Sequence, residues 1–388
     1  MFILVFIVIL SALVLIHEFG HFIVAKRNGI KVEEFGLGFP PRIWGKQIGE
    51  TLYSINALPL GGFVKVYGEE YHEQEGKASA EMKKHGFIYK KPWQKASVLI
   101  AGVVMNILLA VVIFYGLLAS NNFTSDPLIV FDNYHFRFGQ ATGRVIISDI
   151  LNNSVAQKAG LTSDESILRY NTSQDLRLSQ WKDVTSADQL ISVIKNSANM
   201  PIALDLQNVR NGNKTTMQII PKYDKTAQRA VIGAKLANTV VLRYTTPIEK
   251  LFSGFLHSYN MAVYNLKIIG FLIHSSVQEK SVGPVSQSLS GPIGIAGFVK
   301  DILSSSGSKL LYNLLNVMAL FSLSLATINI LPFPALDGGR LAFVMYEWIT
   351  RKRPNATVER IFNTAGFAVL LLLMIFISIN DVTKLFQH

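Results

Sequence analysis

The sequence predicts a polytopic α-helical membrane protein that carries one folded domain outside the bilayer. Of the 388 residues, 49% are hydrophobic and only 16% are charged, whereas ordinary soluble domains carry about 25% charged residues. The chain also contains four apolar stretches, each about long enough to cross ~30 Å of hydrocarbon as a helix. Between the second and the third stretch lies a long segment with the pattern of a soluble domain.

The four apolar stretches are expected to be retained as transmembrane helices. The first has no basic segment before it and no small-residue cleavage site after it, which argues against a removable signal peptide. The fourth is the shortest, and its ends are the least sharply marked. The expected helices lie at about residues 1–25, 96–119, 310–331 and 364–380.

The basic residues predict the orientation of these helices. The net charge is +11, and Lys and Arg are concentrated in the segments that border the helices, with 12 in residues 26–95 and five in residues 340–360. The positive-inside rule therefore places both segments in the cytoplasm, and residues 120–309 and both termini outside. This distribution favours a topology signal over a nucleic-acid footprint, so no nucleic-acid partner is expected. Because the chain has no cysteine, neither disulfides nor thiolate metal ligands are available.

Residues 26–95 are too polar to cross the membrane, yet they contain a patterned stretch. Within "TLYSINALPLGGFVKVYGE", two strand-like runs flank Pro59-Leu60-Gly61-Gly62, which predicts a β-hairpin at about residues 51–68. The alternation in the first run indicates a sheet with one polar face. We expect residues 70–90 to form a loop before the second helix.

Residues 125–240 are typical of one small α+β or barrel-like domain. The segment at 143–171 predicts a strand, a short helix and a second strand. Further strands are expected at 202–209 and 215–220, and a helix at 186–196.

Residues 248–273 repeat apolar side chains at helical spacing, with His257 and Asn260 among the interspersed polar residues. This pattern predicts an amphipathic helix on the membrane surface. A fifth transmembrane helix is the alternative. We expect His257 to be an interfacial polar residue and not a metal ligand.

His17, Glu18 and His21 form an H-E-x-x-H motif inside the first apolar stretch. Residues four apart lie on one face of a helix, so both imidazoles can bind one metal ion, and Glu18 can accept a proton from the attacking water. The alternative is that neighbouring helices satisfy these polar groups. Ionisable residues within transmembrane helices are rare and usually functional, which favours the metal site.

Asp337 is the candidate for a third metal ligand. It lies in "NILPFPALDGGR", just after the third helix, where two prolines break the helical pattern. The predicted topology puts Asp337 and the histidines near the cytoplasmic ends of their helices, so they can meet at one depth. The alternative is that Asp337 only caps an Asp-Gly-Gly turn.

An ordered set of motifs resembles the site-2 protease family of intramembrane zinc metalloproteases, in particular the bacterial regulator-of-sigma-E protease branch. The set covers nearly the whole chain and comprises "HEFGH", "FGLGFPPRI", "LPLGGFVKVYGE", "NSVAQKAGL", "SGPIGIAG", "NILPFPALDGG" and "NDV". The resemblance implies one Zn²⁺ per chain bound by His17, His21 and Asp337, with Glu18 as general base. It also implies that the hairpin re-enters the membrane from the cytoplasmic side and that residues 125–240 form an extracytoplasmic PDZ-like domain with a peptide ligand.

Four further residues have roles only through this resemblance. Asn329 would hold the substrate backbone, and Asn106 would match a G-x-x-x-N helix motif near the substrate. Gly61 and Gly62 would belong to the substrate-binding hairpin. The chain departs from the family pattern at Val103, where relatives often have proline, at Ser324, where they have a second asparagine, and at "SDES" (163–166), where a Gly-Asp turn is usual.

The implied function is a second cut in regulated intramembrane proteolysis. The substrate would be the transmembrane segment of a single-span protein, such as an anti-sigma factor or a signal-peptide remnant, in the bacterial inner membrane. A metal transporter and a non-catalytic PDZ scaffold remain as alternatives. A transporter needs polar residues along a pathway, but the outer halves of the four helices have almost none; a scaffold leaves Glu18 unexplained.

Overall fold

The computed structural model describes residues 1–69, 79–130, 134–163, 165–172, 180–208, 212–225, 227–279, 291–305 and 307–386. The described chain divides into two compact units, and each is considered by itself. The helical unit comprises Met1–Leu117 and Gly254–His388, and the sheet unit comprises Leu118–Ser253.

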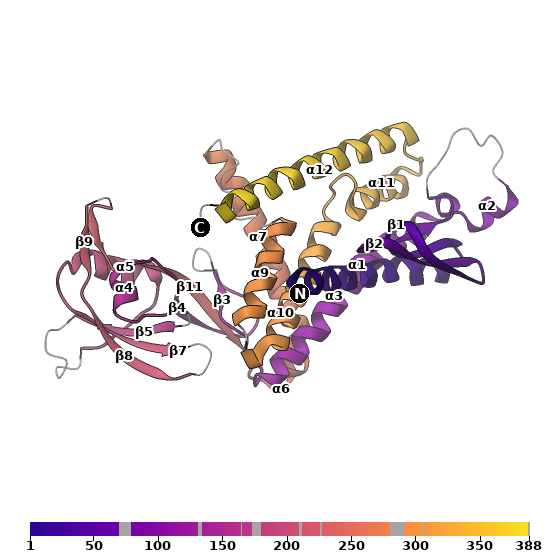
Figure 1. Cartoon of the computed structure of the whole chain (residues 1–388). Helices are drawn as coiled ribbons and strands as arrows, with labels where there is room; N and C mark the ends of the chain where they lie inside the picture. The colour runs from indigo at the N-terminus through magenta and orange to yellow at the C-terminus, as the bar shows by residue number, and fades with distance from the viewer. Residues whose placement is uncertain are drawn as a thin grey trace. The chain divides into compact units, whose positions relative to one another are not determined.

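Among the described residues, four helices are long and apolar enough to cross a membrane, as the sequence predicts. They are α1 (Phe2–Arg27), α3 (Pro92–Ser120), α10 (Leu310–Ile330) and α12 (Ala356–Phe386) (Figure 1). The last helix begins eight residues before the predicted start at 364, because its first turns, "ATVERIFN", are helical but not apolar. The remaining helices of this unit are α2 (Ala80–His85), η1 (Phe87–Tyr89), α7 (Ser253–Gln278), α9 (Pro292–Ser305), η2 (Gly307–Lys309) and α11 (Asp337–Thr350).

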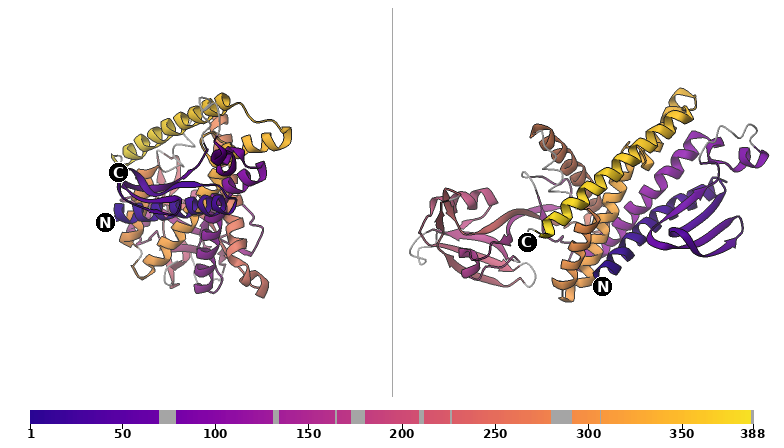
Figure 2. Two further views of the ribbon diagram at one scale, coloured as in Figure 1. Left: turned by 90° about the vertical axis from the view of Figure 1, so that its right-hand side faces the viewer. Right: turned by 45° about the horizontal axis from the view of Figure 1, so that its top comes forward.

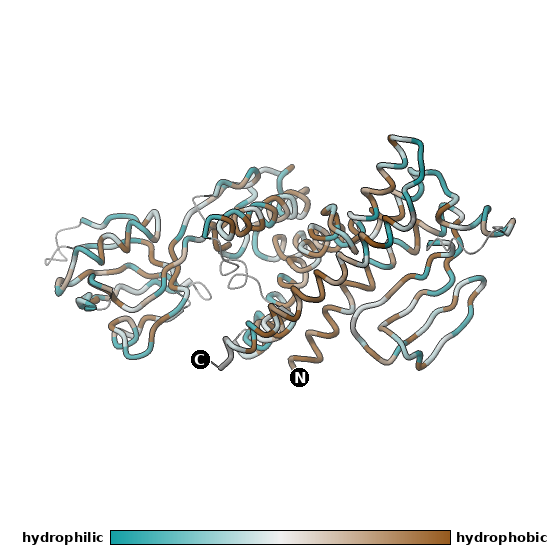
Figure 3. The backbone as a smooth tube through the Cα atoms, turned by 90° about the horizontal axis from the view of Figure 1, so that it is seen from above, coloured by the Kyte–Doolittle hydropathy of each residue, from teal (hydrophilic) through white to brown (hydrophobic). Residues whose placement is uncertain are grey.

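The helical unit exposes many apolar side chains and buries polar ones beside its apolar core. Val8 and Val112 are 58% and 69% exposed, whereas Asn106 and Ser322 are both fully buried at 0%. The hydropathy colouring shows brown, apolar stretches along α1 and α12 (Figure 3). Hydrocarbon surroundings favour this distribution, since lipid tails solvate apolar side chains and polar groups must find partners inside.

The predicted hairpin pairs differently from the expectation. Strand β1 (Val32–Ile48) and strand β2 (Thr51–Val66) form the sheet of this unit, which lies alongside α1 (Figure 2). Phe35 lies opposite both Tyr53 and Val64, so the two halves of β2 flank the first part of β1 and do not pair with each other. Strand β1 was not predicted, because "VEEFGLGFPPRIWG" contains glycines and prolines that normally mark loops.

The polar face of β2 is also on the inside. Ser54 and Asn56 are 4% and 5% exposed, whereas Ile55 is 45% exposed. The Ser54 hydroxyl donates to Glu34 at 2.6 Å, and the Asn56 amide donates to the carbonyl of Gly38 at 3.2 Å. The alternation was predicted correctly, but its polar face points inward. Of the expected loop at 70–90, residues 70–78 lie outside the described residues, and the rest contains α2 and η1.

Helix α7 also directs polar side chains towards the interior of the helical unit. His257 and Asn260 are buried at 4% and 1%, and the His257 ring packs edge-on against Phe114 with centroids 4.8 Å apart. Phe255 is 56% exposed, and Asn265 donates to the Ser324 hydroxyl of α10 at 3.2 Å. His257 is therefore a packed residue of the helical unit. The membrane-surface position of α7 stays a prediction, although its polar face packs against other helices.

The sheet unit is built around a seven-stranded sheet with the order β3-β11-β4-β5-β7-β8, in which β6 pairs with β5. These strands are β3 (Leu128–Ile129), β4 (Gln140–Ile150), β5 (Glu165–Asn171), β6 (Lys182–Asp183), β7 (Ile202–Asn208), β8 (Lys214–Ile219) and β11 (Ala234–Arg243). A small second sheet pairs β9 (Lys222–Asp224) with β10 (Arg229–Val231), and the helices are α4 (Val155–Lys158), α5 (Ala187–Asn196) and α6 (Pro247–Leu251). The strands and helices predicted within 143–219 are confirmed.

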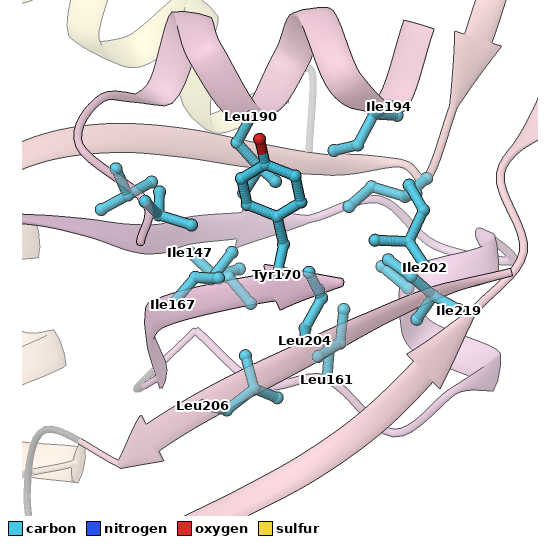
Figure 4. Close-up of a cluster of buried hydrophobic side chains, with 14 of the residues drawn as sticks. Ile147, Leu161, Ile167, Tyr170, Leu190, Ile194, Ile202, Leu204, Leu206 and Ile219 are labelled. Carbon is cyan, nitrogen blue, oxygen red and sulfur yellow. The ribbon is translucent and has the colours of Figure 1, made fainter. Parts of the chain in front are cut away.

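The sheet unit has an apolar core. Ala187, Leu190 and Ile194 recur on one face of α5 and are buried against the strands (Figure 4). Leu204 of β7, in the same cluster, is fully buried at 0%. Ser186 caps the N-terminus of α5, and its side chain accepts a hydrogen bond from the backbone N–H of Gln189. The unit therefore folds like a water-soluble domain, by burying apolar side chains.

Candidate metal centre

Helix α1 presents His17 and His21 on one face. Both are buried, at 5% and 9%, and their ring centroids are 4.8 Å apart. Between them, Gly20 permits a close approach of α3, because a Cβ at this position would collide with the backbone carbonyl of Ala101. The local sequence thus supplies both the spacing of the imidazoles and the narrow gap between the helices.

The chain bends sharply after α10 to bring Asp337 to the histidines. Helix α10 ends at Ile330, and the prolines of "LPFPA" prevent its continuation. A side chain at Gly338 would collide with the carbonyl of Leu331, so only glycine permits this tight return. Asp337 begins α11, and its Oδ2 lies 3.0 Å from His17 Nε2 and 3.3 Å from His21 Nε2.

The spacing of these three atoms fits a tetrahedral metal site. The two Nε2 atoms are 3.2 Å apart, which completes a triangle with sides of 3.0, 3.2 and 3.3 Å. Ligands about 2.0–2.1 Å from a zinc ion with tetrahedral angles are about 3.3 Å from one another. Two imidazole nitrogens and one carboxylate oxygen are also a donor set that zinc accepts, with a fourth position left for water or substrate.

Helix α3 fixes the outer side of both imidazoles. His21 Nδ1 lies 2.8 Å from the carbonyl oxygen of Val98, and His17 Nδ1 lies 3.2 Å from the side-chain amide of Asn106. Gly102 lies between these contacts, and a Cβ there would be 2.5 Å from His21 Nε2 and 2.7 Å from His17 Cε1. Helix α3 can therefore hold the rings only with glycine at this position.

Glu18 is half-buried and adjacent in sequence to His17, one of the candidate metal ligands. It interacts electrostatically with both histidines, with Asp337 and with Glu69. Glu69 forms an ion pair with Arg340, which joins the segment after β2 to α11. The site thus contains two carboxylates. That of Asp337 is a candidate metal ligand, and that of Glu18 forms no direct ion pair with a cation among the described residues.

Of the other predicted site residues, Asn329 and Asn106 contact His17, and the two glycines lie against α1. Asn329 Nδ2 is 3.4 Å from His17 Nε2, on the side of the ring that faces the other ligands. A Cβ at Gly61 would be 3.3 Å from Val14, and one at Gly62 would be 3.8 Å from Leu15. The bend in β2 is fastened to the same helix, because the Ser11 hydroxyl donates to the carbonyl of Pro59 at 2.7 Å.

Several residues of the site were not singled out by the sequence analysis. The carbonyl of Val98 carries no side-chain signal, and the Glu69–Arg340 pair joins positions 271 residues apart. Gly20 and Gly102 could have been found, since small residues in apolar helices mark close helix contacts.

Comparison with known proteins agrees with this geometry. The model of peptidase family M50 matches residues 5–373. A Clostridium acetobutylicum protein that carries the name of a zinc metalloprotease is 31% identical, over 96% of this chain and 94% of its own length. A Clostridium perfringens protein named in the same way is 28% identical, over 96% of both chains. Zinc metalloprotease RasP of Geobacillus kaustophilus is 26% identical, over 98% of this chain and 97% of its own.

The match extends from α1 to α12 and includes all three metal-ligand candidates together with Glu18. The helices that hold these residues are also the ones apolar enough to cross a membrane. The chain is thus an integral membrane protein, and it belongs to peptidase family M50, the family of the site-2 proteases.

Proposed function

We propose that this protein is a zinc-dependent intramembrane endopeptidase that cleaves transmembrane segments of single-span membrane proteins. One observation carries the proposal. His17, His21 and Asp337 offer ligand atoms that lie within 4.8 Å of one another, beside Glu18 and among helices with apolar outer faces. The zinc metalloprotease names of similar proteins support the choice of metal, and one ion per chain is part of the proposal.

The residues divide the chemistry among them. When bound, zinc would lower the pKa of water towards about 7 and stabilise the negative charge that develops on the scissile carbonyl. Glu18 accepts the proton of the attacking water and delivers it to the leaving amine. His17, His21 and Asp337 hold the ion, and the surrounding helices exclude bulk water. Asn329, whose amide lies 3.4 Å from His17 Nε2, is placed to hold the substrate backbone beside the reacting bond.

A transmembrane substrate must lose its helical structure before cleavage, because a helix buries its own peptide groups in hydrogen bonds. The β1–β2 sheet supplies a strand edge on which an extended peptide can pair. The bend at Gly61 and Gly62 packs against α1 about one turn before His17, so a peptide added there would lie near the metal centre. This sheet is the proposed membrane-reentrant element.

The sheet unit and the topology complete the proposal. We assign the sheet unit as a PDZ-like domain outside the cytoplasm that binds a peptide and admits substrates already trimmed by another protease. Both termini would then lie outside, in a bacterial inner membrane, and the cut would be the second in regulated intramembrane proteolysis. This arrangement corresponds to the regulator-of-sigma-E branch of the family.

The proposal is tested by proteolysis in reconstituted vesicles. Purified protein is incorporated with a single-span test substrate, and wild type is compared with Glu18→Gln. Glu50→Gln is the matched control, since this exposed glutamate pairs with Lys26 and lies outside the site. We expect zinc to be retained in all three proteins and cleavage to be lost only in Glu18→Gln. Cleavage by Glu18→Gln would contradict the mechanism, and zinc flux without cleavage would instead indicate a transporter.

A further inference from the structure

The two nitrogens of His17 have different surroundings. Nε2 lies 3.0 Å from Asp337 Oδ2 and 3.2 Å from His21 Nε2, so it faces the metal position. Nδ1 points away and lies 3.2 Å from the Nδ2 atom of Asn106. Asn106 is fully buried at 0%, and its Oδ1 has no hydrogen-bond partner among the described residues.

The metal position decides which atom of Asn106 must face the ring. A neutral imidazole has one N–H group, and a nitrogen that binds a metal must be the other one. His17 therefore needs its proton on Nδ1, which then donates and requires an acceptor. The Nδ2 atom of an amide is a donor and cannot fill this role. The amide oxygen and nitrogen exchange places by a half rotation, which turns Oδ1 towards Nδ1.

His21 shows the same arrangement with a different acceptor. Its Nδ1 lies 2.8 Å from the carbonyl oxygen of Val98, which can only accept. The proton of His21 is thus on Nδ1, and its Nε2 is free for the metal. Val98 and Asn106 both belong to α3. For His17, the side chain of Asn106 takes the place that a backbone carbonyl has for His21.

We infer that Asn106 is a positioning residue of the metal centre, whose side-chain oxygen accepts the Nδ1 proton of His17 and holds Nε2 ready for zinc. The inference rests on the proposed function, since it assumes zinc at this site. The inference also changes the role of Asn106, which the family resemblance placed near the substrate. Asn106 instead contacts Nδ1 of the His17 ring, on the side away from the metal position.

The surroundings of Asn106 fit a fixed role. The Ser322 hydroxyl of α10 donates to the backbone carbonyl of Asn106 at 2.8 Å and anchors this turn of α3. Gly102, one turn earlier, lets the His17 ring lie directly against the helix. In either orientation of the Asn106 amide, one of its two polar atoms has no hydrogen-bond partner: Oδ1 before the half rotation and Nδ2 after it. The orientation is therefore decided by the Nδ1 proton of His17, which needs an acceptor.

The test measures zinc affinity without any substrate, by competition with a chelator. Asn106→Leu keeps the size of the side chain but removes the acceptor, and we expect zinc affinity to fall about 10- to 100-fold, the usual effect of losing such a partner. Asn106→Asp retains an acceptor in the same place, and we expect it to keep affinity within about threefold of wild type. Gly116→Ala is the control on the same helix, because a Cβ there has nothing within 4 Å, and we expect it to keep wild-type zinc affinity.

The outcomes separate the inference from the proposed function. If wild type and Asn106→Leu bind zinc equally tightly, the positioning role is wrong, and a substrate role would then appear as a raised KM alone. Equal losses in Asn106→Leu and Asn106→Asp would also contradict it, since an acceptor would then not matter. If wild type binds no zinc, the proposed function itself fails. Thermal unfolding of each variant shows whether it has folded.

Discussion

Both units of this protein bury apolar side chains, but the helical unit also buries polar groups between its helices and exposes large apolar side chains. In the sheet unit, Leu190 and Leu204 are completely buried, as in any domain that folds in water. In the helical unit, the completely buried residues include Asn106 and Ser322, whereas Val112 is 69% exposed. The hydrophobic effect drives the first arrangement. The second depends on apolar surroundings, in which internal hydrogen bonds and close packing hold the helices together.

This difference explains how one chain can house an ionisable metal site. In the helical unit, polar groups gather inside because lipid tails offer them no partners. His17, His21 and Asp337 are an extension of that polar interior, and glycines at the helix contacts allow them to meet. The following predictions test this contrast, from the largest expected effect to the smallest.

Two glycines of α3 should differ sharply when each is replaced by alanine. A Cβ at Gly102 would lie 2.5–2.8 Å from the His17 and His21 rings, whereas one at Gly116 has nothing within 4 Å. We expect Gly102→Ala to lower cleavage on the order of 100-fold or more, since an ångström of misplacement has this effect. Gly116→Ala should retain wild-type activity. Similar rates for the two variants in the vesicle assay would show that α3 does not confine the site.

The buried ion pair between α3 and α11 should respond to single and double replacement in opposite ways. Lys95 Nζ lies 2.6 Å from Glu347 Oε2, and both side chains are largely buried. Lys95→Met leaves an unpaired carboxylate and should cost about 3–5 kcal/mol, but adding Glu347→Met should recover most of this loss. Thermal unfolding in detergent measures both. A double variant no more stable than the single one would contradict the proposed polar interior.

Shortening an apolar side chain should matter in the sheet unit and hardly at all on the helical surface. Leu190→Ala creates a cavity in the apolar core (0% exposed) and should lower the free energy of unfolding by about 2–5 kcal/mol. Val112→Ala removes methyl groups from an exposed position and should change it by less than about 0.5 kcal/mol. Equal effects in the same unfolding experiment would mean that Val112 is packed inside the protein.

The smallest predicted effect concerns the fastening of β2 to α1. Ser11→Ala removes the hydrogen bond to the carbonyl of Pro59, worth about 1 kcal/mol. If the sheet presents the substrate, KM should rise about fivefold with kcat unchanged, because about 1 kcal/mol is lost from binding only. Ser11→Thr keeps a hydroxyl and should behave as wild type. A fall in kcat at constant KM would argue against a binding role for this bend.

The sequence was most informative where ionisable residues lie in or next to an apolar helical stretch. H-E-x-x-H within an apolar stretch and Asp337 after a helix-breaking segment were enough to predict the candidate ligand set, and the structure brings these three residues together. The strands and helix of the sheet unit followed from ordinary alternation, because each buries apolar side chains on one face. These patterns are local, so no knowledge of the tertiary structure was needed.

Other features depend on contacts that no local pattern encodes. Strand β1 was missed because its glycines and prolines are loop signals, yet its pairing on both sides with β2 stabilises it. Helix α7 was expected to lie on the membrane surface, but residues of the same unit cover its polar side chains, and the alternation in β2 did not reveal that its polar face points inward. The contact of Asn106 with His17 joins residues 89 positions apart. Each case requires knowing what surrounds the element.

The metal content of the purified protein tests the central claim most directly. Protein isolated with zinc is examined by elemental analysis and X-ray absorption, together with His21→Ala. We predict one zinc ion per chain in wild type, with two imidazole nitrogens and a carboxylate oxygen in its coordination shell, and loss of the ion or of one imidazole in His21→Ala. Wild type without zinc, or a coordination shell unchanged by His21→Ala, would contradict the assignment of this polar interior as a zinc site.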